Sequence, residues 1–353
     1  MQTSLVSIVM PTFNSARTIE KSLQSISEQD YPRSSVEILL LDGGSTDETL
    51  KIGERYGAIA IPNPKTQQEY GKFIGLNEAN GEFIIFLDSD EVFCNQNAIA
   101  KRVNLFKSNS KIGMVLTGGY QHTPGTSPIN DYINMFSDPF AFYMNRISSD
   151  AHIFTQDMIK KFNADAECNG GYVLNFKKNK SLPLIDLCAG NTISKKIFTP
   201  EYGLDKANLS LIPTMFYAIV EKGISVAVLN NDAILHYSAD TIKNYLRKLK
   251  WRVTVNIHYQ HIPGTGFSNR ESFQPAITKF KKYLFPLYSI SLIAPIFDSL
   301  FQFRRKGYWI NFIHTPLCLY VTYNIGLQYI FKIFGHKPKI FSYGANTKEL
   351  NLD

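Results

Sequence analysis

Short runs of consecutive apolar residues recur along the first third of the chain. Three of them, Ser7–Met10, Val36–Leu41 and Phe83–Leu87, are rich in β-branched, aliphatic or aromatic side chains and hold at most one polar residue each. Such runs predict strands that are buried on both faces, as in a parallel sheet covered by helices. Helical spacing follows the first run, with Ile19 and Leu23 on one face. The alternation of strand and helix predicts a doubly wound α/β fold.

Each predicted strand is followed by a polar loop. The loops are Thr12–Asn14, Asp42–Ser45 and Asp88–Asp90. Because the carboxyl ends of parallel strands meet at one edge of a sheet, we expect the three loops to form one ligand site. In the second loop, Ser45 and Glu48 match a capping box that would begin a helix. A helix start at this place would offer backbone N–H groups to a nucleotide.

The third loop carries two carboxylates, Asp88 and Asp90, directly after a buried strand. Carboxylates at such a position are costly unless positive charge reaches them. Their spacing suits Mg²⁺ or Mn²⁺, which binds a few carboxylates and keeps the rest of its coordination shell for water and phosphate oxygens. A solvated turn after the strand is the alternative interpretation of the pair.

Four motifs over residues 1–100, in this order and spacing, resemble those of the family 2 glycosyltransferases. They are Pro11-Thr12-Phe13-Asn14, Asp42-Gly43-Gly44-Ser45-Thr46-Asp47, Gly75-Leu76-Asn77-Glu78-Ala79-Asn80-Gly81-Glu82 and Leu87-Asp88-Ser89-Asp90. The resemblance implies the GT-A fold, a Rossmann-like and mostly parallel sheet flanked by helices. It also implies an inverting enzyme that transfers a sugar from a nucleotide-diphosphate donor to an acceptor nucleophile.

The resemblance also implies the residues of the nucleotide-sugar site. Pro11, Thr12 and Asn14 would line the nucleotide, and Asp42 would contact the base. Lys72 and Asp88 would contact ribose or phosphate, and Asp90 would hold the metal. The full set is Pro11, Thr12, Asn14, Asp42, Lys72, Asp88, Ser89 and Asp90. One departure concerns Gly43, which stands where many relatives have a second acid, so we expect fewer contacts to the base.

The metal shell is expected to hold Asp90, Asp88 and one histidine. In the resembling family, a histidine at the place of His236 completes the coordination beside the acid. Neutral imidazole suits Mn²⁺ alongside carboxylates. A lone histidine after an apolar run is otherwise usually a structural residue, and this interpretation stays open.

The general base is harder to assign. In the family an acidic residue near the start of a later helix takes the proton of the acceptor hydroxyl, but that position falls near Leu211-Ile212 in this chain. Asp205 and Glu201, just upstream, are the nearest substitutes, followed by Asp186. Any of them must lie within hydrogen-bond reach of the attacking hydroxyl.

Charge divides the chain unevenly. Residues 1–240 hold 21 Lys and Arg against 26 Asp and Glu, whereas residues 241–353 hold 16 against 4. The net charge of +7 therefore comes from the last third. The four cysteines are far apart and show no metal-binding spacing, which indicates reduced thiols in a cytosolic setting. The amino terminus lacks the features of a signal peptide, so we expect the catalytic part to face the cytosol.

The basic last third combines cationic and apolar segments. Residues 243–257 place apolar and basic residues on opposite sides of a predicted amphipathic helix, and 283–303 and 308–331 are long apolar segments. Prolines interrupt both segments, and a spanning hairpin would place Arg304-Arg305-Lys306 outside the cell. These features favour interfacial or re-entrant helices at a membrane surface over two spanning helices. The long apolar segments argue against a nucleic-acid partner.

Together these features predict a catalytic domain at 1–240, with a nucleotide-binding half at 1–100 and an acceptor half at 101–240, and a membrane-associating helical region at 241–353. We expect a metal-dependent inverting glycosyltransferase at the cytoplasmic face of the cell membrane, with a lipid-linked or cell-surface glycan as acceptor. Two alternatives are a binding subunit that keeps the nucleotide pocket without transfer, and a nucleotidyltransferase. The latter should carry a Gly-rich basic loop after the first strand, which is absent here. The sequence indicates no oligomeric state.

Overall fold

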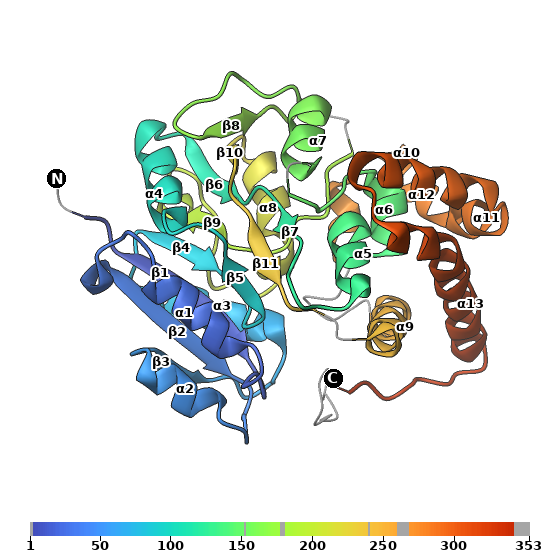
Figure 1. The fold of residues 1–353 in the computed structure, drawn as a ribbon, viewed down its shortest axis with the longest axis horizontal. Coiled ribbons are helices and arrows are strands. Elements are labelled where there is room, and N and C mark those ends of the chain that lie inside the picture. The colour runs from blue at the N-terminus through green and yellow to red at the C-terminus, as the bar shows by residue number, and fades with distance from the viewer. Residues whose placement is uncertain (1–2, 152, 177–180, 239–240, 260–267, 342–353) are drawn as a thin grey trace.

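The computed structural model describes residues 3–151, 153–176, 181–238, 241–259 and 268–341. A large sheet forms its centre (Figure 1). Its strands are β1 (Val6–Thr12), β2 (Val36–Asp42), β3 (Ile59–Pro62), β4 (Phe83–Phe86), β6 (Ile112–Leu116), β8 (Gly171–Leu174), β9 (Asn191–Ser194) and β10 (Ser225–Leu229). Their order is β3-β2-β1-β4-β9-β6-β10-β8. Only β9 and β8 run antiparallel to their neighbours, so the predicted mostly parallel α/β sheet is confirmed.

Helices cover both faces of this sheet. They are α1 (Ile19–Ser27), α2 (Thr49–Arg55), α3 (Gln68–Glu78), α4 (Ala98–Ser108), α7 (Ile153–Phe162) and α8 (Leu211–Glu221). Successive residues of β1 point to opposite faces, as the period of a strand requires. Ile8 and Met10 join the apolar core beneath α1, α2 and α4, whereas Val9 joins the core with α3, α7 and α8.

A buried ion pair connects three parts of the domain. The Arg102 guanidinium on α4 donates to the Asp232 carboxylate at 2.8 Å and to the carbonyl of Gly190 at 2.9 Å. Both charged side chains are fully buried. A buried ion pair is tolerated when further hydrogen bonds satisfy its donors, as they do here. The pair therefore fixes the loop before β9, which contains Gly190, against the segment between β10 and β11 (Ile234–His236).

A second, three-stranded sheet adjoins the first in the order β5-β11-β7, with β5 at Glu91–Phe93 and β7 at Tyr120–Gln121. β11 pairs antiparallel with β5 and parallel with β7. The register places His236 opposite Glu91. This small sheet therefore carries the predicted metal ligand His236 to the segment that directly follows Asp90.

The basic last third packs on helices that the sequence did not predict, α5 (Pro128–Phe136) and α6 (Pro139–Asn145). Its own helices are α9 (Ile242–His258), α10 (Ala276–Lys281), α11 (Phe285–Ile290), α12 (Ile293–Lys306) and α13 (His314–Ile333), with a 3₁₀ turn, η3, at Ser268–Phe273. Residues of α5, α6, α9, α11 and α13 share one apolar core. In Figure 1 the helices α10–α13 lie at the end of the molecule, beyond α5 and α6 as seen from the sheet.

The two long apolar segments of the last third are broken into shorter helices. The break in the first lies at Ser291-Leu292, where Leu292 has a φ of +55° and α10–α11 meets α12 at 90°. Among the described residues, no single helix is both long and apolar enough to cross a bilayer, although this bent pair together would meet the requirement of length and composition.

Several of the C-terminal helices expose their apolar side chains. On α12 the buried residues include Ser299 and Gln302, whereas Phe297 on the outer face is 66% exposed. On α13, Asn324 and Gln328 are buried while Ile333 is 80% exposed. Among the described residues, every exposed large apolar side chain except Leu50 and Ile59 lies after residue 241. An apolar surface of this extent is unusual for a monomer in water and marks an interaction surface.

The buried side chain of His314, at the start of α13, makes the stability of the folded protein depend on pH. Its ring accepts or donates hydrogen bonds with Tyr132 at 2.8 Å and Tyr288 at 3.0 Å and stacks on Phe136. Burial, with a smaller effect of Arg146, lowers the pKa of His314 to about 3. In the unfolded chain the same group titrates near pH 6.5. Unfolding therefore takes up a proton below that pH, and stability falls as the pH falls.

We expect acidification from about pH 7 to about pH 5 to lower the free energy of unfolding by about 2 kcal/mol through His314 alone. Urea unfolding followed by tryptophan fluorescence at both pH values measures this change. In His314→Gln the loss on acidification should be smaller by about the same amount, because glutamine does not titrate. An unchanged loss in this variant would contradict the assignment.

Candidate functional site

The carboxyl ends of β1, β2 and β4 lie side by side at one edge of the large sheet. The parallel register pairs Thr12 with Asp42 and Val9 with Phe86. The polar loops that follow these strands therefore meet, as the sequence predicts. The backbone N–H of Gly43 donates to the carbonyl of Thr12 at 2.8 Å and joins the first two loops directly.

Side chains of these loops hold them to one another. Asn14 donates its backbone N–H to Ser45 Oγ at 2.9 Å and accepts from the N–H of Thr46 at the same distance. Its φ of +48° lies in the left-handed region, which asparagine tolerates better than most residues. Ser89 donates to Ser15 Oγ at 2.9 Å. Asn14 and Ser89 thus build the edge itself, and their predicted contacts with the nucleotide stay predictions.

The capping box predicted at Ser45 and Glu48 is wrong. Helix α2 begins at Thr49, and Asp47 accepts the N–H of Thr49 at 3.0 Å instead. Ser45 donates its hydroxyl to Asp42 Oδ1 at 2.5 Å. The loop between β2 and α2 therefore closes on the Asp42 carboxylate rather than on the start of the helix.

A hollow of about 310 Å³ lies beside Asp42, between the turn Asp42–Gly44 and the end of β3. Asp42 Oδ2 accepts the backbone N–H groups of Gly44 at 3.0 Å and Ser45 at 2.9 Å, which fixes the carboxylate at the rim. Gly43 has no space for a side chain, because a Cβ there would lie 2.7 Å from the methyl group of Thr66. This packing gives a physical reason for glycine where many relatives have an acid.

Thr12 and Pro11 differ in their relation to this edge. The Thr12 hydroxyl is buried, and in the described part of the chain it has no hydrogen-bond partner. A bound ligand would satisfy it, since buried polar groups are rarely left unpaired. Pro11 is buried in β1 beside Gly71 of α3, where an added Cβ would be in ordinary contact with the proline side chain at 3.4 Å. Its predicted contact with the nucleotide stays a prediction.

Asp88 is neutralised by residues of α3. Lys72 Nζ lies 3.1 Å from Asp88 Oδ1, and Gln68 donates to Asp88 Oδ2 at 2.5 Å. Burial alone would lower the pKa of Lys72, but the Asp88 carboxylate raises it overall, so the lysine stays charged. Oδ2 of Asp88 thus accepts a hydrogen bond, and Oδ1 has the ammonium of Lys72 as its counter-charge. Asp88 is therefore a poorer metal ligand than the sequence suggested.

Asp90 and His236 meet at the mouth of the edge, with Nε2 of His236 3.7 Å from Asp90 Oδ2. Adjacent ligands of an octahedral ion with bonds of about 2.1 Å lie about 3.0 Å apart, so the two side chains would have to approach one another slightly to bind one ion. Burial lowers the pKa of His236 to about 4, with Lys248 and Arg252 adding to the effect and Asp90 opposing it. The imidazole is therefore neutral near pH 7, as a metal ligand must be. Its ring stacks on Tyr120, with centroids 4.6 Å apart.

Glu91 is a residue of this site that the sequence analysis did not single out. Its carboxylate is buried and accepts hydrogen bonds from the N–H of Asp88 at 2.8 Å, the N–H of Ala189 at 2.6 Å and the hydroxyl of Tyr120 at 2.9 Å. Burial, with the charges of Asp88 and Asp90, raises its pKa to about 8. Its place next to Asp90 was the only signal in the sequence, and an acid after a strand usually faces water.

Two groups of side chains in the described chain could hold a metal ion. Ligand atoms of Asp88, Glu91 and Cys188 all lie within 4.8 Å of one another. Glu91 and Asp88, however, already satisfy backbone and side-chain donors, so an ion there would have to break these bonds. Within the described residues, the side chains of Asp90 and His236 contact each other at 3.7 Å, and Nδ1 of His236 is buried without a hydrogen-bond partner. The geometry favours the Asp90–His236 pair.

Of the acids predicted as general base, Asp186 lies at this edge. It belongs to the loop that leads to β9, and its side chain is 53% exposed while paired with Arg270 of η3. Arg270, followed by Lys72, lowers the pKa of Asp186 against the effect of burial. Burial raises the pKa of Glu69, in the first turn of α3, while the charges of Lys72 and Arg270 oppose this effect. Arg270 also donates to the carbonyl of Pro213 at 2.8 Å, which anchors it to the first turn of α8.

Asp205 and Glu201 lie away from the site, so their prediction as general base is wrong. Gln68, which contacts Asp88, and Asn77 are nine residues apart on α3, which corresponds to about 13 Å along the helix. Asn77 donates to the carbonyl of Lys206, so the segment with Asp205 lies near the far end of α3. Asp205 itself accepts the N–H of Ala207 in a surface turn. Glu201 follows the carboxyl end of β9, at the opposite edge of the sheet, because β9 runs antiparallel to β4. A base must reach the acceptor hydroxyl, which neither acid can do.

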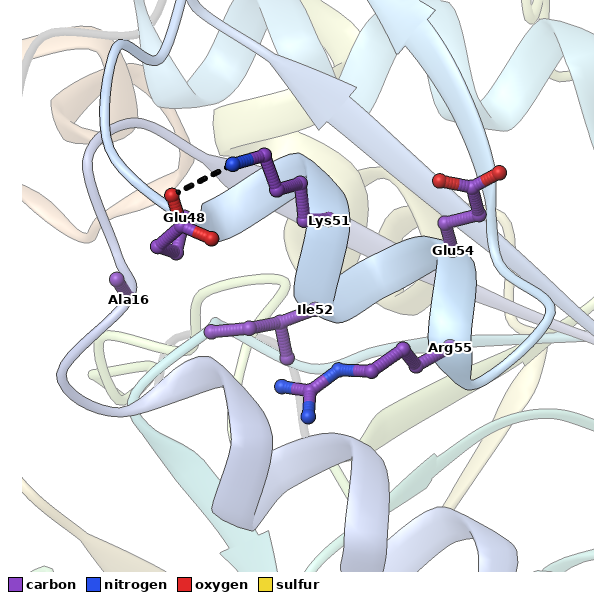
Figure 2. A pocket seen from close by; sticks show the side chains of 6 residues that line it. All are labelled: Ala16, Glu48, Lys51, Ile52, Glu54 and Arg55. Atoms are coloured by element: carbon purple, nitrogen blue, oxygen red, sulfur yellow. Dashed lines mark hydrogen bonds and ion pairs between the residues drawn. The ribbon is translucent and has the colours of Figure 1, made fainter.

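Another hollow lies outside this edge, on α2 (Figure 2). Three of its four charged residues are paired, Lys51 with Glu48 at 2.9 Å and Arg55 with Glu20 of α1 at 3.0 Å. These pairs are exposed to solvent, and exposed pairs of this kind contribute little. The hollow offers no buried polar group, so it is a surface depression between two helices.

Comparison with known proteins gives the same assignment as the site. The model of the family described as glycosyl transferase family 2 matches residues 7–168. The poly(ribitol-phosphate) beta-N-acetylglucosaminyltransferase TarS of Staphylococcus aureus is 34% identical over 91 residues, which are 24% of this chain and 16% of TarS.

A second relative comes from Methanococcus voltae, a dolichyl N-acetyl-alpha-D-glucosaminyl phosphate 3-beta-D-2,3-diacetamido-2,3-dideoxy-beta-D-glucuronosyltransferase. It is 32% identical over 122 residues, 33% of this chain and 38% of the relative. The chain therefore spans less than two fifths of the length of either protein.

Among solved structures, a mannosyltransferase from Pyrobaculum calidifontis in complex with GDP-Man and Mn²⁺ has a similar fold. The TM-score is 0.51 at 14% sequence identity, and the alignment covers 94% of this chain and 88% of the other. At this identity the likeness concerns the fold alone. Residues 7–168, which include the motif-bearing edge, match the family 2 glycosyltransferases, and the chain has the GT-A fold.

Proposed function

We propose that this protein is a metal-dependent, inverting glycosyltransferase that moves a sugar from a nucleotide-diphosphate sugar to a glycan acceptor. The observation that carries the proposal is the pair Asp90 and His236, 3.7 Å apart, at the edge where the Asp42 hollow also opens. A nucleotide-diphosphate sugar presents a base, a ribose and a diphosphate in sequence. The hollow, the Asp88–Lys72 pair and the metal ligands offer matching contacts in that order.

Each part of this edge would act on one part of the donor. The base would enter the hollow against Asp42, and the unpaired Thr12 hydroxyl would receive a polar group of the nucleoside. Asp90 and His236 would hold Mg²⁺ or Mn²⁺, which as a Lewis acid stabilises the charge that develops on the departing diphosphate. Lys72, whose charge is balanced by Asp88, would contact a ribose or phosphate oxygen of the donor.

Asp186 is our candidate for the general base. The acceptor hydroxyl would attack the anomeric carbon as the bond from that carbon to the diphosphate breaks, and Asp186 would take the hydroxyl proton. Inversion requires attack from the face opposite to the leaving group. Support comes from the location of Asp186 at the correct edge and from its half-exposed carboxylate. Arg270 would keep that carboxylate ionised and oriented.

We further propose that the protein works at the cytoplasmic face of the cell membrane on a lipid-linked or cell-surface glycan. The exposed apolar residues of α10–α13 support this proposal, since interfacial helices bury such side chains at the boundary of headgroups and acyl chains. Much of the basic charge expected to contact lipids is engaged within the protein, as in the pairs of Arg305 with Asp157 and Lys306 with Asp150. The apolar surface therefore carries the proposal. The names of both curated relatives include phosphate-linked acceptors, a polymer and a dolichyl lipid.

One observation favours a second function, a binding subunit without transfer activity. Leu211 and Ile212 stand where an acidic pair is expected, and both are buried in the core. A protein that binds the donor without a base at that place would hold the nucleotide sugar and release it unchanged. The two functions differ in whether Asp186 acts on an acceptor.

Replacement of the metal ligand should abolish both transfer and metal binding. We expect Asp90→Asn to lower transfer at least about 100-fold, and to remove the Mn²⁺-dependent rise in melting temperature that UDP or GDP gives the unmodified protein. Thermal unfolding with and without MnCl₂ measures the second effect. Glu54→Gln on the surface of α2 is the matched control and should behave like the unmodified protein. Full activity of Asp90→Asn would remove the metal assignment.

If Asp186 is the general base, its replacement should impair sugar transfer without impairing binding of the donor. In Asp186→Asn we expect the rate constant kcat to fall about 100-fold or more, with affinity for the donor nucleotide nearly unchanged, because the base acts on the acceptor. Asp205→Asn is the control and should leave kcat intact. Donor binding with no transfer in the unmodified protein, tested with a membrane extract as acceptor, would favour the binding subunit.

Membrane association is testable by flotation with vesicles of phosphatidylcholine and phosphatidylglycerol. We expect the protein to float with the vesicles and the double variant Ile293→Asp, Phe297→Asp to remain in solution, because both side chains are exposed and charge opposes insertion. Leu50→Asp, an exposed apolar position on α2, is the control and should still float. Equal flotation of all three proteins would argue against the surface of α12 as the contact.

A further inference from the structure

Helix α9 directs one of its lysines toward the metal site. Lys248 is half-buried, and its ammonium donates to Ser238 Oγ at 3.2 Å. Ser238 is two residues beyond His236 and is itself held by Asn130, whose side-chain oxygen accepts its N–H at 3.2 Å. The ammonium therefore lies beside the segment that presents the imidazole of His236.

The apolar side of α9 fixes this orientation. Tyr245 and Leu249 are buried in the core shared with α5, α6 and α13. Lys248 is three residues from Tyr245 and one from Leu249, so it lies at the margin of the buried face rather than in free solvent. The sequence predicts an amphipathic helix here, with apolar and basic residues on opposite sides. Lys248 instead faces inward.

Lys248 lacks a close counter-charge in the described part of the chain. Its hydrogen-bond acceptor is a neutral hydroxyl, and none of the ion pairs within 4.0 Å includes it. Its neighbour Arg252, in contrast, is paired with Asp138 at 2.7 Å. Burial, followed by the charge of Arg252, lowers the pKa of Lys248, and the carboxylates of Asp90 and Asp88 oppose this effect. A half-buried ammonium without an anion is costly, which indicates a place for an anionic ligand.

We propose that Lys248 binds a phosphate group of a ligand in the site. This inference rests on the proposed function and extends it to α9. A diphosphate held by a divalent ion at Asp90 and His236 leaves excess negative charge at the site once Asp88 is neutralised by Lys72. A cation next to His236 would balance that charge and would also stabilise the departing diphosphate.

The phosphate could belong to the donor diphosphate or to a phosphate-bearing acceptor. Both would present oxygens of the same charge and geometry to the ammonium, and Lys248 recognises a phosphate as a point charge in either case. The position beside His236 favours the donor, because the metal ligands and the lysine would then contact one diphosphate from two sides.

Calorimetric titration of the whole chain with UDP and with GDP, in the presence of Mn²⁺, tests whether Lys248 binds the diphosphate of the donor. For the nucleotide that binds more tightly, we expect Lys248→Gln to weaken binding about tenfold or more, and Lys248→Arg to restore most of the affinity. Lys250→Gln, an exposed lysine on the same helix, is the matched control and should leave the affinity unchanged. Melting curves of all variants establish that they are folded.

Binding of inorganic phosphate to the protein saturated with Mn²⁺ and nucleotide diphosphate tests whether Lys248 binds a phosphate of the acceptor. Unchanged nucleotide binding in Lys248→Gln together with loss of phosphate binding would assign the lysine to the acceptor. Unchanged binding of both ligands would overturn the inference while leaving the proposed function intact. Absence of nucleotide binding in the unmodified protein, with Mn²⁺ present, would overturn both.

Discussion

The site depends on how three carboxylates, Asp88, Asp90 and Glu91, are accommodated at the end of one buried strand. Placed so close together with little water, they would repel one another strongly. The fold gives each a different environment. Asp88 has Lys72 and Gln68, and Glu91 accepts two backbone N–H groups and the hydroxyl of Tyr120. Asp90 alone keeps an open side next to a neutral imidazole. This division of roles makes one of the three acids available for an ion.

The small sheet makes this division possible. Glu91 begins β5 and pairs in register with His236 of β11. The buried, hydrogen-bonded acid and the histidine that is available to a metal ion are therefore neighbours on adjacent strands. Tyr120 of β7 completes the arrangement by stacking on the imidazole while donating to Glu91. Three segments that are far apart in the sequence are thereby locked around the acid that follows β4.

Much of the fold and part of the site could be predicted from the sequence. Continuous apolar runs identify β1, β2 and β4, and the order of their polar loops gives the resemblance to the family that residues 7–168 match, because both signals are local. The general base could not be found in this way. Asp205 and Asp186 look alike in the sequence, but β9 runs antiparallel to β4 and so places the segment after it at the far edge. Side-chain direction likewise decides that Glu91 is buried and that Ser45 bonds to Asp42, and no periodic pattern contains this information. Helical spacing places Lys248 at the margin of the buried face of α9, but it does not predict the contact with Ser238.

The contact of η3 with the catalytic part has a practical consequence for engineering. Arg270 reaches from the basic last third to both Asp186 and the carbonyl of Pro213, and Gln274 exchanges two hydrogen bonds of 3.0 Å with the backbone of Leu182. A shortened protein that ends near residue 240, the boundary at which the charge changes, would lose these supports along with the apolar helices. Such a truncation would also uncover the apolar faces of α5 and α6, which pack against α9, α11 and α13. Inactivity of the fragment would therefore say nothing about membrane binding, and a useful shortened form has to keep the chain at least through Gln274.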